Sequence, residues 1–333
     1  MPRLINMMSF RTHLRFHTAL QLLLALESAE ETLVGGQAVL EGVMMRAPHA
    51  WGIAIRKPGG ELAIHSEPLV KPSDKSPWKA WPFIRGIVTL GSAMVLGFKA
   101  LRYSADVALE DEKTASGEKL EMNGWVAAFN IALSLGFFIF MYKFLPYAVA
   151  RWLRHWAPQT THSALFALVE GLIRLAIFLG FIWLTSRWSD IRRVYEYHGA
   201  EHKTVFAYEN HDSLTAQAVQ RYSTYHPRCG TSFLMTVMII SIAVYALVPV
   251  HGFWAGFASR IILLPVIVGG SYEIIRYAAK KRSSLFAMMT APGLWLQRIT
   301  TQPPDNAQIE CAIVALNHAM ELEEQHGGEL VIA

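Results

Sequence analysis

Stretches of about 20 predominantly apolar residues constrain the fold of this chain more than any other feature. Four of them lie at 125–148, 163–185, 231–250 and 254–275. Each is long enough for a helix to cross the hydrocarbon core of a bilayer, which takes about 20 such residues. Only 17% of the residues are charged, whereas soluble domains usually carry about 25%. The sequence therefore predicts a mainly α fold, a polytopic membrane helical bundle, with the lipid bilayer as its partner.

Charge and cysteine usage argue against two other classes of protein. The net charge is +4, but the Lys and Arg residues lie mostly beside the apolar stretches, as in membrane proteins. We therefore expect no nucleic-acid partner. The two cysteines, Cys229 and Cys311, are too few for a disulfide framework. We interpret both as thiols in a reducing compartment.

A further apolar stretch, at 86–104, differs from the four in its charge. Its first half is apolar, and its second half carries Lys99 and Arg102. This pattern fits a membrane-associated helix that lies in the membrane plane or inserts in part. Whether this stretch crosses the bilayer is left open.

The placement of basic residues predicts the orientation of the bundle. With four crossings, the N-terminal region, the connection 186–230 and the C-terminus share one side. The basic residues expected on that side are Arg187, Arg192, Arg193, Lys203, Arg221, Arg228, Arg276, Lys280, Lys281 and Arg282. The opposite side holds Arg151 and Arg154. Because cytosolic loops carry the excess of Lys and Arg, we expect both termini to be cytosolic.

The region before the first span divides into three segments. Residues 1–32 form a basic amphipathic N-terminal extension, in which no small-residue cleavage site follows the apolar run ALQLLLAL. Residues 33–70 form a small β-rich cytosolic element, because AWGIAIRK and ELAIHSE are joined by the turn-forming PGG. Residues 71–124 comprise a linker and the membrane-associated helix.

The other boundaries follow from the spans. We expect a first transmembrane hairpin at 125–185, a cytosolic loop and helix at 186–230, a second hairpin at 231–275, and a cytosolic C-terminal helical region at 276–333. In that last region Asp305 and Gln308 have the spacing of a capping box. One face of the helix that follows carries apolar residues at helical spacing, namely Ile309, Ile313, Leu316 and Met320.

The most distinctive polar motif is H-x-x-E-H, formed by His198, Glu201 and His202. On a helix, residues four apart share one face, so both imidazoles can reach one metal ion. In zinc peptidases with this inverse order, the motif supplies two ligands and a general base. The sequence therefore suggests a Zn²⁺ site, or a site for another divalent metal, with Glu201 as catalytic base. A pattern of five residues also arises by chance.

Completing the site requires further ligands. His226 and Cys229 lie three apart in HPRCG, just before the third span, and offer an imidazole and a thiolate. The alternative is a turn that starts a helix and buries its cysteine. Glu209 lies about 10 Å along the helix from His202 at 1.5 Å per residue. It therefore cannot share an ion with both histidines of a straight helix, and we interpret it as a supporting residue.

Two other polar features lie outside this motif. Glu170 and Arg174 are four apart inside the second span, where ionisable groups are costly and usually pair. We expect an intramembrane ion pair there, with a polar pathway as the alternative. In GGQAVLEGVMMR, Glu41 follows an apolar run next to Gly42 and is expected on a turn. It faces the histidine site in one interpretation and caps backbone amides in the other.

Several blocks of the sequence together resemble one known family. These are VGGQAVLEGVMMR (34–46), YHGAEHKTVFAYE (197–209), HPRCGTSFL (226–234), SYEIIR (271–276) and APGLWLQRITTQPPD (291–305). They are similar to the YqhQ-like family of bacterial multi-pass membrane proteins, whose function is unknown and which are labelled metal-dependent enzymes. The resemblance covers about residues 33–325 and implies the bacterial inner membrane as location. By motif, it implies site roles for Glu41, Arg46, His198, Glu201, His202, Glu209, His226, Arg228 and Cys229.

These observations leave three functional hypotheses. The first is a metal-dependent hydrolase that acts at the cytosolic face on a membrane-associated peptide or lipid. The second is a non-catalytic membrane scaffold, in which zinc holds the 186–230 loop against the spans. The third is a transporter or channel that uses Glu170 and Arg174. A homo-oligomer is compatible with each hypothesis.

Overall fold

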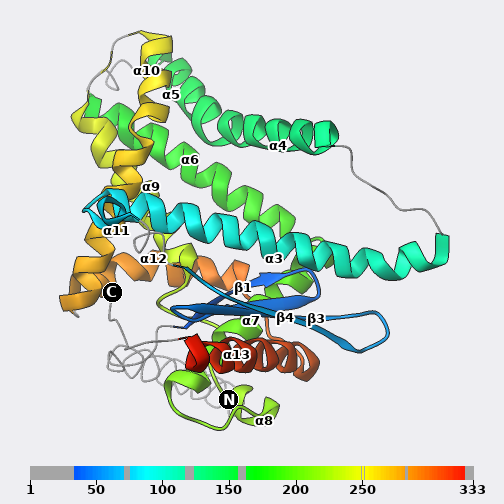
Figure 1. The fold of residues 1–333 in the computed structure, drawn as a ribbon. Helices are drawn as coiled ribbons and strands as arrows, with labels where there is room; N and C mark the ends of the chain where they lie inside the picture. The colour runs from blue at the N-terminus through cyan, green and yellow to red at the C-terminus, as the bar shows by residue number, and fades with distance from the viewer. Residues whose placement is uncertain are drawn as a thin grey trace, which may run out of the picture.

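The computed structural model describes residues 34–70, 76–116, 124–156, 163–248, 250, 252–281 and 284–326. This part of the chain is mainly helical and carries one small antiparallel sheet near its N-terminal end (Figure 1). The mainly α fold with a small N-terminal β element is thus confirmed. The expected extension at 1–32 lies outside the described residues.

The sheet has four strands in sequential order. They are β1 (Gly35–Val39), β2 (Gly42–Arg46), β3 (Ala50–Arg56) and β4 (Leu62–Pro68), each antiparallel to the next. The predicted hairpin around PGG joins β3 to β4. Gly60 has a φ of 91°, a left-handed value that favours glycine. Its amide donates to the Lys57 carbonyl at 2.9 Å, which closes the turn.

The other regular elements of the described chain are helices. They are η1 (Pro77–Ala80), α3 (Ile84–Ser116), α4 (Gly124–Ile139), the π-helical turn η2 (Phe140–Phe144), α5 (Leu145–Trp156), α6 (Ser163–Thr185), α7 (Ser189–Glu209), α8 (Ala216–Val219), α9 (Gly230–Leu247), α10 (Phe253–Ile262), α11 (Leu264–Lys281), α12 (Ser284–Thr300) and α13 (Asn306–His326).

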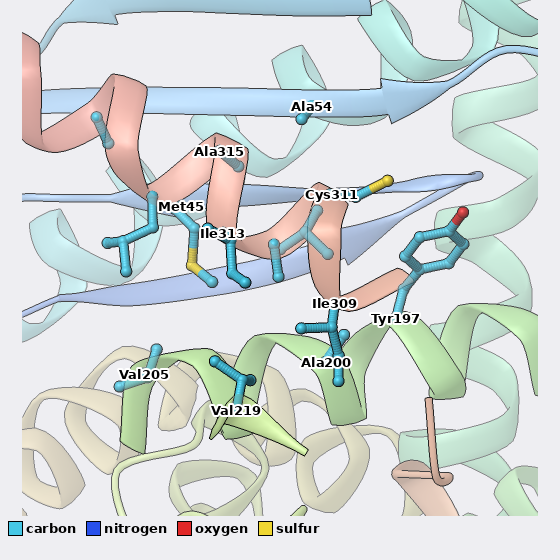
Figure 2. Packing of buried hydrophobic residues seen from close by; sticks show 14 of the residues in the cluster. Met45, Ala54, Tyr197, Ala200, Val205, Val219, Ile309, Cys311, Ile313 and Ala315 are labelled. Atoms are coloured by element: carbon cyan, nitrogen blue, oxygen red, sulfur yellow. The ribbon is translucent and has the colours of Figure 1, made fainter. Parts of the chain in front are cut away.

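One face of the sheet is covered by α13, which packs beside α7 (Figure 2). The buried residues of this core include Met45 and Ala54 from the sheet, Ala200 from α7, and Ile309 and Ala315 from α13. The predicted capping box begins α13: the Gln308 amide donates to Asp305 Oδ1 at 2.7 Å, and the Asp305 amide donates to Gln308 Oε1 at 2.9 Å. The final helix is therefore an integral part of the sheet domain.

The other face of the sheet is covered by α3 (Figure 1). Leu96, Ala100 and Val107 of α3 are buried against strand residues such as Trp51 and Ile53. The opposite side of α3 is apolar but exposed, with Val95 at 70% and Phe98 at 67% of full exposure. The helix thus has two apolar faces, and the sheet covers one of them.

Among the described residues, four helices are long and apolar enough to cross a membrane. They are Ile84–Ala108, Ala132–Trp156, Ala164–Thr185 and Gly230–Leu247. The count equals the predicted one, but the set differs. The 86–104 stretch, not counted as a span from its sequence, meets the criterion within α3. The predicted span at 254–275 is two helices, Phe253–Ile262 and Leu264–Tyr277, bent by 40°, which meet the criterion only together.

Prolines account for the irregular points of the bundle. Pro265 follows the break between α10 and α11, and Pro146 follows the π-helical turn η2. Proline has no amide hydrogen to donate to the preceding turn and its ring crowds the carbonyl there, so a helix bends or widens before it. The last predicted span is therefore interrupted.

Candidate metal centre

Three side chains from two elements converge at the junction of α7 and α9. His198 and His202 lie one turn apart on α7, and Cys229 is the N-cap residue of α9. The nitrogen and sulfur atoms that these residues offer lie within 4.8 Å of one another. His198 Nε2 is 3.4 Å from Cys229 Sγ. We call these three residues the His–Cys cluster.

Backbone carbonyls orient both imidazoles. Nδ1 of His198 lies 2.8 Å from the carbonyl oxygen of Thr300, and Nδ1 of His202 lies 2.5 Å from that of Thr224. A carbonyl only accepts hydrogen bonds, so Nδ1 carries the hydrogen in each ring and Nε2 keeps its lone pair. Among the residues that the structure describes, none forms a hydrogen bond with the buried Nε2 of His202. Metal-binding histidines use this arrangement, in which the distal nitrogen donates to a carbonyl or a carboxylate.

The donor set and its spacing fit a zinc ion. Two donors held at 2.0–2.3 Å from zinc at the tetrahedral angle lie about 3.5 Å apart. The observed Nε2–Sγ distance of 3.4 Å agrees with this value. Two imidazoles and a thiolate suit Zn²⁺ rather than Mg²⁺ or Ca²⁺, which prefer oxygen. Cys229 also lies at the N-terminus of an 18-residue helix, where the helix dipole favours negative charge.

A close backbone approach brings the Thr300 carbonyl to His198. A Cβ atom on Gly199 would lie 2.1 Å from the carbonyl oxygen of Gln302. The Gln302 amide donates to the Tyr195 carbonyl at 2.9 Å. The segment after α12 can therefore lie against α7 only because residue 199 is glycine.

Glu201 is buried directly beside the cluster. Its Oε2 lies 3.4 Å from His202 Nε2, and a Cβ atom on Gly36 of β1 would lie 2.6 Å from its Cγ. Burial raises the pKa of Glu201 to about 7, and the repulsion of Glu209 adds to this, while His198 and the Gly36 amide oppose it. A carboxyl with this pKa exchanges protons near neutral pH. Gly36, the second glycine of the first sequence block, thus leaves room for the Glu201 side chain.

His226 lies outside the cluster, although its motif suggested a ligand. Its Nε2 is 3.3 Å from Glu209 Oε2, and its Nδ1 accepts from the Arg228 amide at 3.3 Å. Burial lowers the pKa of His226 to about 4, so the ring is neutral at pH 7. Both ring nitrogens are thus engaged. Of the two candidates in HPRCG, the structure brings Cys229 to the histidine pair.

Glu209 and Arg228 support His226 rather than the cluster itself. Glu209 is buried and ion-paired with Arg228. Burial alone would raise the pKa of Glu209, but His226 and Arg228 together lower it. Gln297 of α12 holds the His226 backbone on both sides, since its side-chain amide accepts from the amide and donates to the carbonyl, each at 2.8 Å.

Glu41 and Arg46 lie outside the His–Cys cluster. Glu41 lies on the β1–β2 turn with a φ of 53°, as a turn carboxylate. It pairs with Arg193 at the start of α7, at 2.6 Å from Nη2, and accepts from the Tyr197 hydroxyl at 3.3 Å. Arg46 ends β2, where burial lowers its pKa. Among the described residues, neither Glu41 nor Arg46 forms a hydrogen bond or an ion pair with the His–Cys cluster.

The long apolar helices hold a second group of charges. Glu170 pairs with Arg174 at 2.6 Å and with Arg260 of α10 at 2.7 Å. Arg174 also donates to the Ser241 hydroxyl at 2.7 Å. Sequence reasoning singled out Glu170 and Arg174 but missed Arg260. The signal was present, because Arg260 is a lone charge in the first half of the 254–275 stretch.

Comparison with known proteins places these features in a family context. Residues 81–322 match the protein family described as "Protein of unknown function (DUF1385)". The chain is also 33% identical over 297 residues to the "Uncharacterized protein YqhQ" of Bacillus subtilis (strain 168), covering 87% of this chain and 92% of that protein. No solved structure matches the chain.

Proposed function

Because the chain belongs to the YqhQ-like DUF1385 family, which supplies no activity to transfer, we propose a function from the geometry of the site. The proposed function is that of a membrane-bound, metal-dependent hydrolase. Its metal centre would consist of His198, His202 and Cys229 and would bind Zn²⁺ or a similar divalent ion. Its substrate would be a peptide or lipid at the membrane surface.

One observation carries this proposal. Within the described part of the chain, His202 Nε2 is buried and makes no hydrogen bond, with Glu201 Oε2 3.4 Å away, while the other nitrogen of the ring is held by the Thr224 carbonyl. A buried polar atom without a partner costs free energy, about 1–3 kcal/mol. A metal ion is a partner that also uses the lone pairs of His198 and Cys229. Coordination of the metal ion by His202 Nε2 would then offset this cost.

The proposed chemistry follows from the residues around the cluster. When bound, Zn²⁺ supplies a Lewis acid that favours the ionisation of water near neutral pH. The cluster offers three donors, one fewer than a closed structural zinc site, and catalytic zinc sites have three protein ligands. Glu201 Oε2 is the group placed to take a proton from water, because its pKa of about 7 lets it accept and release protons at physiological pH.

The shared core constrains how the chain can cross a membrane. The sheet precedes every candidate span, α7 lies between α6 and α9, and α13 follows α11, yet all three pack in one core. Parts of one core lie on one side of a bilayer. An even number of crossings must therefore separate the sheet from α7, and α7 from α13.

This parity constrains which of the apolar helices can cross. Between the sheet and α7 lie three candidates, Ile84–Ala108, Ala132–Trp156 and Ala164–Thr185. The candidate that does not cross is the first, because α3 packs along the sheet. Between α7 and α13, α9 crosses once and the bent pair α10–α11 crosses once. We infer four crossings, with α3 in the membrane–water interface and its exposed apolar face toward the lipid.

In this topology the cluster would lie at the membrane surface. Cys229 immediately precedes the span α9, and the sheet domain lies at that end of the bundle. The basic residues of the connection between α6 and α9 lie on this side, so it would be the cytosolic side of the bacterial inner membrane. A substrate embedded in or bound to that leaflet would reach the cluster without leaving the membrane.

Metal analysis of the purified protein tests the proposal. We expect about one Zn²⁺ per chain in the wild type, by analogy with single-ion sites of this donor set. His198→Ala and Cys229→Ala should lose the ion, whereas the control His318→Ala, at a half-buried position on α13, should keep it. Wild-type protein without metal after purification and zinc addition would contradict the proposal.

Glu201→Gln then separates hydrolysis from a structural role. The substitution removes the base and preserves the shape, so it should keep the metal but abolish complementation of a strain that lacks the gene. Activity should fall at least about 100-fold, as for other general bases. Full complementation by Glu201→Gln would rule out the general-base role.

The burial of His202 favours a second candidate function, a structural zinc centre. His202 is only 1% exposed, and the cluster joins α7 to α9 while carbonyls of two further segments hold its rings. In that case His202→Ala would lower the melting temperature and Glu201→Gln would leave complementation intact. The two candidates therefore predict opposite results for one variant.

A further inference from the structure

Four charged residues meet inside the helical bundle, away from the His–Cys cluster. They are Lys143, Glu170, Arg174 and Arg260, and we call them the bundle charge cluster. They come from η2, α6 and α10. Glu170 is fully buried, and the side chains of Arg174 and Arg260 are each only 5% exposed. Ionisable groups at such depth in a membrane protein usually have a function.

The charges of this cluster do not balance. Glu170 is its single carboxylate, and both arginines bind it, Arg174 at 2.6 Å and Arg260 at 2.7 Å. The Lys143 ammonium donates a hydrogen bond to the Tyr245 hydroxyl at 3.5 Å. Among the described residues, no carboxylate lies within ion-pair distance of Lys143. Three cations therefore face one anion in a region shielded from water.

Aromatic rings reduce this imbalance but do not remove it. The Tyr245 ring lies 5.4 Å from the Arg174 guanidinium and 4.9 Å from that of Arg260. The Lys143 ammonium lies 5.9 Å from the same ring. Such contacts are individually weak compared with the cost of burying an unpaired charge. Arg174 Nε is also buried without a hydrogen-bond partner.

The backbone presents Lys143 to the cluster in an unusual way. Lys143 lies in the π-helical turn η2, within the span Ala132–Trp156. π-helical turns are rare and occur frequently at functional sites. The turn precedes Pro146, so the irregularity is fixed by the sequence. The irregular turn thereby brings Lys143 beside the Tyr245 ring. Both arginines of the cluster lie near the same ring.

The cluster lies in the half of the bundle farther from the sheet. Tyr147 of α5 contacts Arg260 through its ring, at 4.6 Å, and its hydroxyl donates to the Gly252 carbonyl at 3.2 Å. Gly252 begins α10, at the end of the bundle away from the sheet and α13 (Figure 1). Arg151 donates to the same hydroxyl at 3.1 Å. Polar contacts thus lead from the cluster to the end of the bundle that is farther from the sheet.

We propose that the bundle charge cluster binds an anionic phosphate-class group, supplied by the headgroup of a membrane lipid. Guanidinium and ammonium groups are the donors that recognise phosphate oxygens, and basic sites between transmembrane helices bind anionic headgroups. The anion supplies the negative charge that Glu170 alone does not. This inference takes the bundle as membrane-spanning, but it does not depend on the His–Cys cluster.

Anion-dependent stability tests this proposal. The full chain is reconstituted in nanodiscs of phosphatidylcholine, with or without phosphatidylglycerol, and its melting temperature and retained lipid are measured. The wild type should melt higher with phosphatidylglycerol and retain it in native mass spectrometry. Lys143→Met should weaken that retention at least about tenfold, as expected for the loss of one charge-assisted contact. It should also abolish the lipid-dependent rise.

A matched control and an opposite variant sharpen the result. Lys79→Met removes a lysine of η1 outside the cluster and should respond as the wild type does. Glu170→Gln increases the charge excess, so it should make folding more dependent on the anion. If Glu170→Gln does not fold, Lys143→Met alone decides. Zinc content should stay unchanged in Lys143→Met, which separates this test from that of the metal centre.

Each outcome has a defined meaning. Inorganic phosphate added to phosphatidylcholine nanodiscs, against chloride at equal ionic strength, tests for a free anion as the source. Stabilisation by phosphate that Lys143→Met abolishes supports the anion site and identifies a soluble ligand. If neither lipid nor phosphate stabilises the wild type, or if Lys143→Met responds as fully as the wild type, the proposal is overturned.

Discussion

His198 Nε2 lies 3.4 Å from Cys229 Sγ, although 31 residues separate the two in the chain. The contact joins the helix that carries H-x-x-E-H to the first turn of α9. Thr231 Oγ1 donates to the same sulfur at 3.3 Å. These polar contacts of the sulfur are compatible with the proposed role of Cys229 as a metal ligand.

Replacement of Cys229 should therefore reduce metal affinity strongly. We expect Cys229→Ser to weaken zinc binding by more than the roughly 10- to 100-fold that loss of an outer partner of a ligand costs. Cobalt substitution provides the measurement, because a sulfur-to-cobalt charge-transfer band should be present in the wild type and absent from the variant. Cys311→Ser is the control, since Cys311 lies in the core of the sheet domain. An unchanged band in Cys229→Ser would exclude the thiolate ligand.

His226 should behave as a structural residue. His226→Ala leaves Glu209 buried without one of its partners and should lower the free energy of unfolding by about 1–3 kcal/mol. It should keep the metal, because both ring nitrogens are engaged away from the cluster. Chemical denaturation and metal analysis of one preparation check both expectations. Loss of metal without loss of stability would contradict this assignment.

Stability should also depend on pH through His226. Burial lowers the pKa of this ring from 6.5 to about 4, so between these values the unfolded chain binds a proton that the folded chain does not. The contribution of His226 to the free energy of unfolding then rises with pH, by up to about 1.4 kcal/mol per unit. It is complete above the unfolded pKa of 6.5. The difference between wild type and His226→Gln, measured across this window, should therefore grow with pH; a constant difference would refute the neutral buried ring.

Gly199 offers a test of how the cluster is positioned. Gly199→Ala would place a Cβ atom 2.1 Å from the Gln302 carbonyl oxygen, so the segment after α12 must move away from α7. The Thr300 carbonyl would move with it and release the His198 ring. We expect a destabilisation of about 1–3 kcal/mol and faster zinc loss to a chelator. Gly91→Ala is the control, because nothing lies within 4 Å of its Cβ position; equal zinc loss in both variants would speak against the mechanism.

Cysteine accessibility tests the proposed topology. Single cysteines at Glu61, Ser213 and Glu324 represent the sheet domain, and one at Trp254 represents the distal end of the bundle. In intact cells an impermeant reagent should label only the Trp254→Cys variant. Labelling of Ser213→Cys from outside would reverse the orientation. Labelling of Glu61→Cys and Ser213→Cys from different sides would show that α3 crosses the membrane.

The sequence revealed those parts of the fold that rest on local periodicity. Long apolar runs, the PGG turn and the capping box at Asp305 could be predicted because each depends on residues close in the chain. The role of α3 could not be predicted in this way, because one of its two apolar faces packs against the sheet and the other is exposed. Composition cannot tell which of these surroundings each face will meet.

The candidate site was predictable to a similar degree. His198 and His202 followed from helical spacing, whereas the choice between His226 and Cys229 depended on how the 210–230 connection folds back. The groups that orient the rings are the backbone carbonyls of Thr224 and Thr300. Any residue presents a carbonyl, so no side-chain motif could have indicated them. Arg260 was overlooked although its charge was visible in the apolar stretch.

The core in Figure 2 has a consequence for biosynthesis. Its parts come from before, between and after the spans, so the core cannot close until α13 has left the ribosome. By then α4 to α11 have been synthesised, and β2 and β3 have waited with Met45 and Ala54 uncovered. Chains that stop before Asn306 would insert their helices yet present this apolar face to chaperones and proteases. Helix α13 therefore completes the core of the sheet domain.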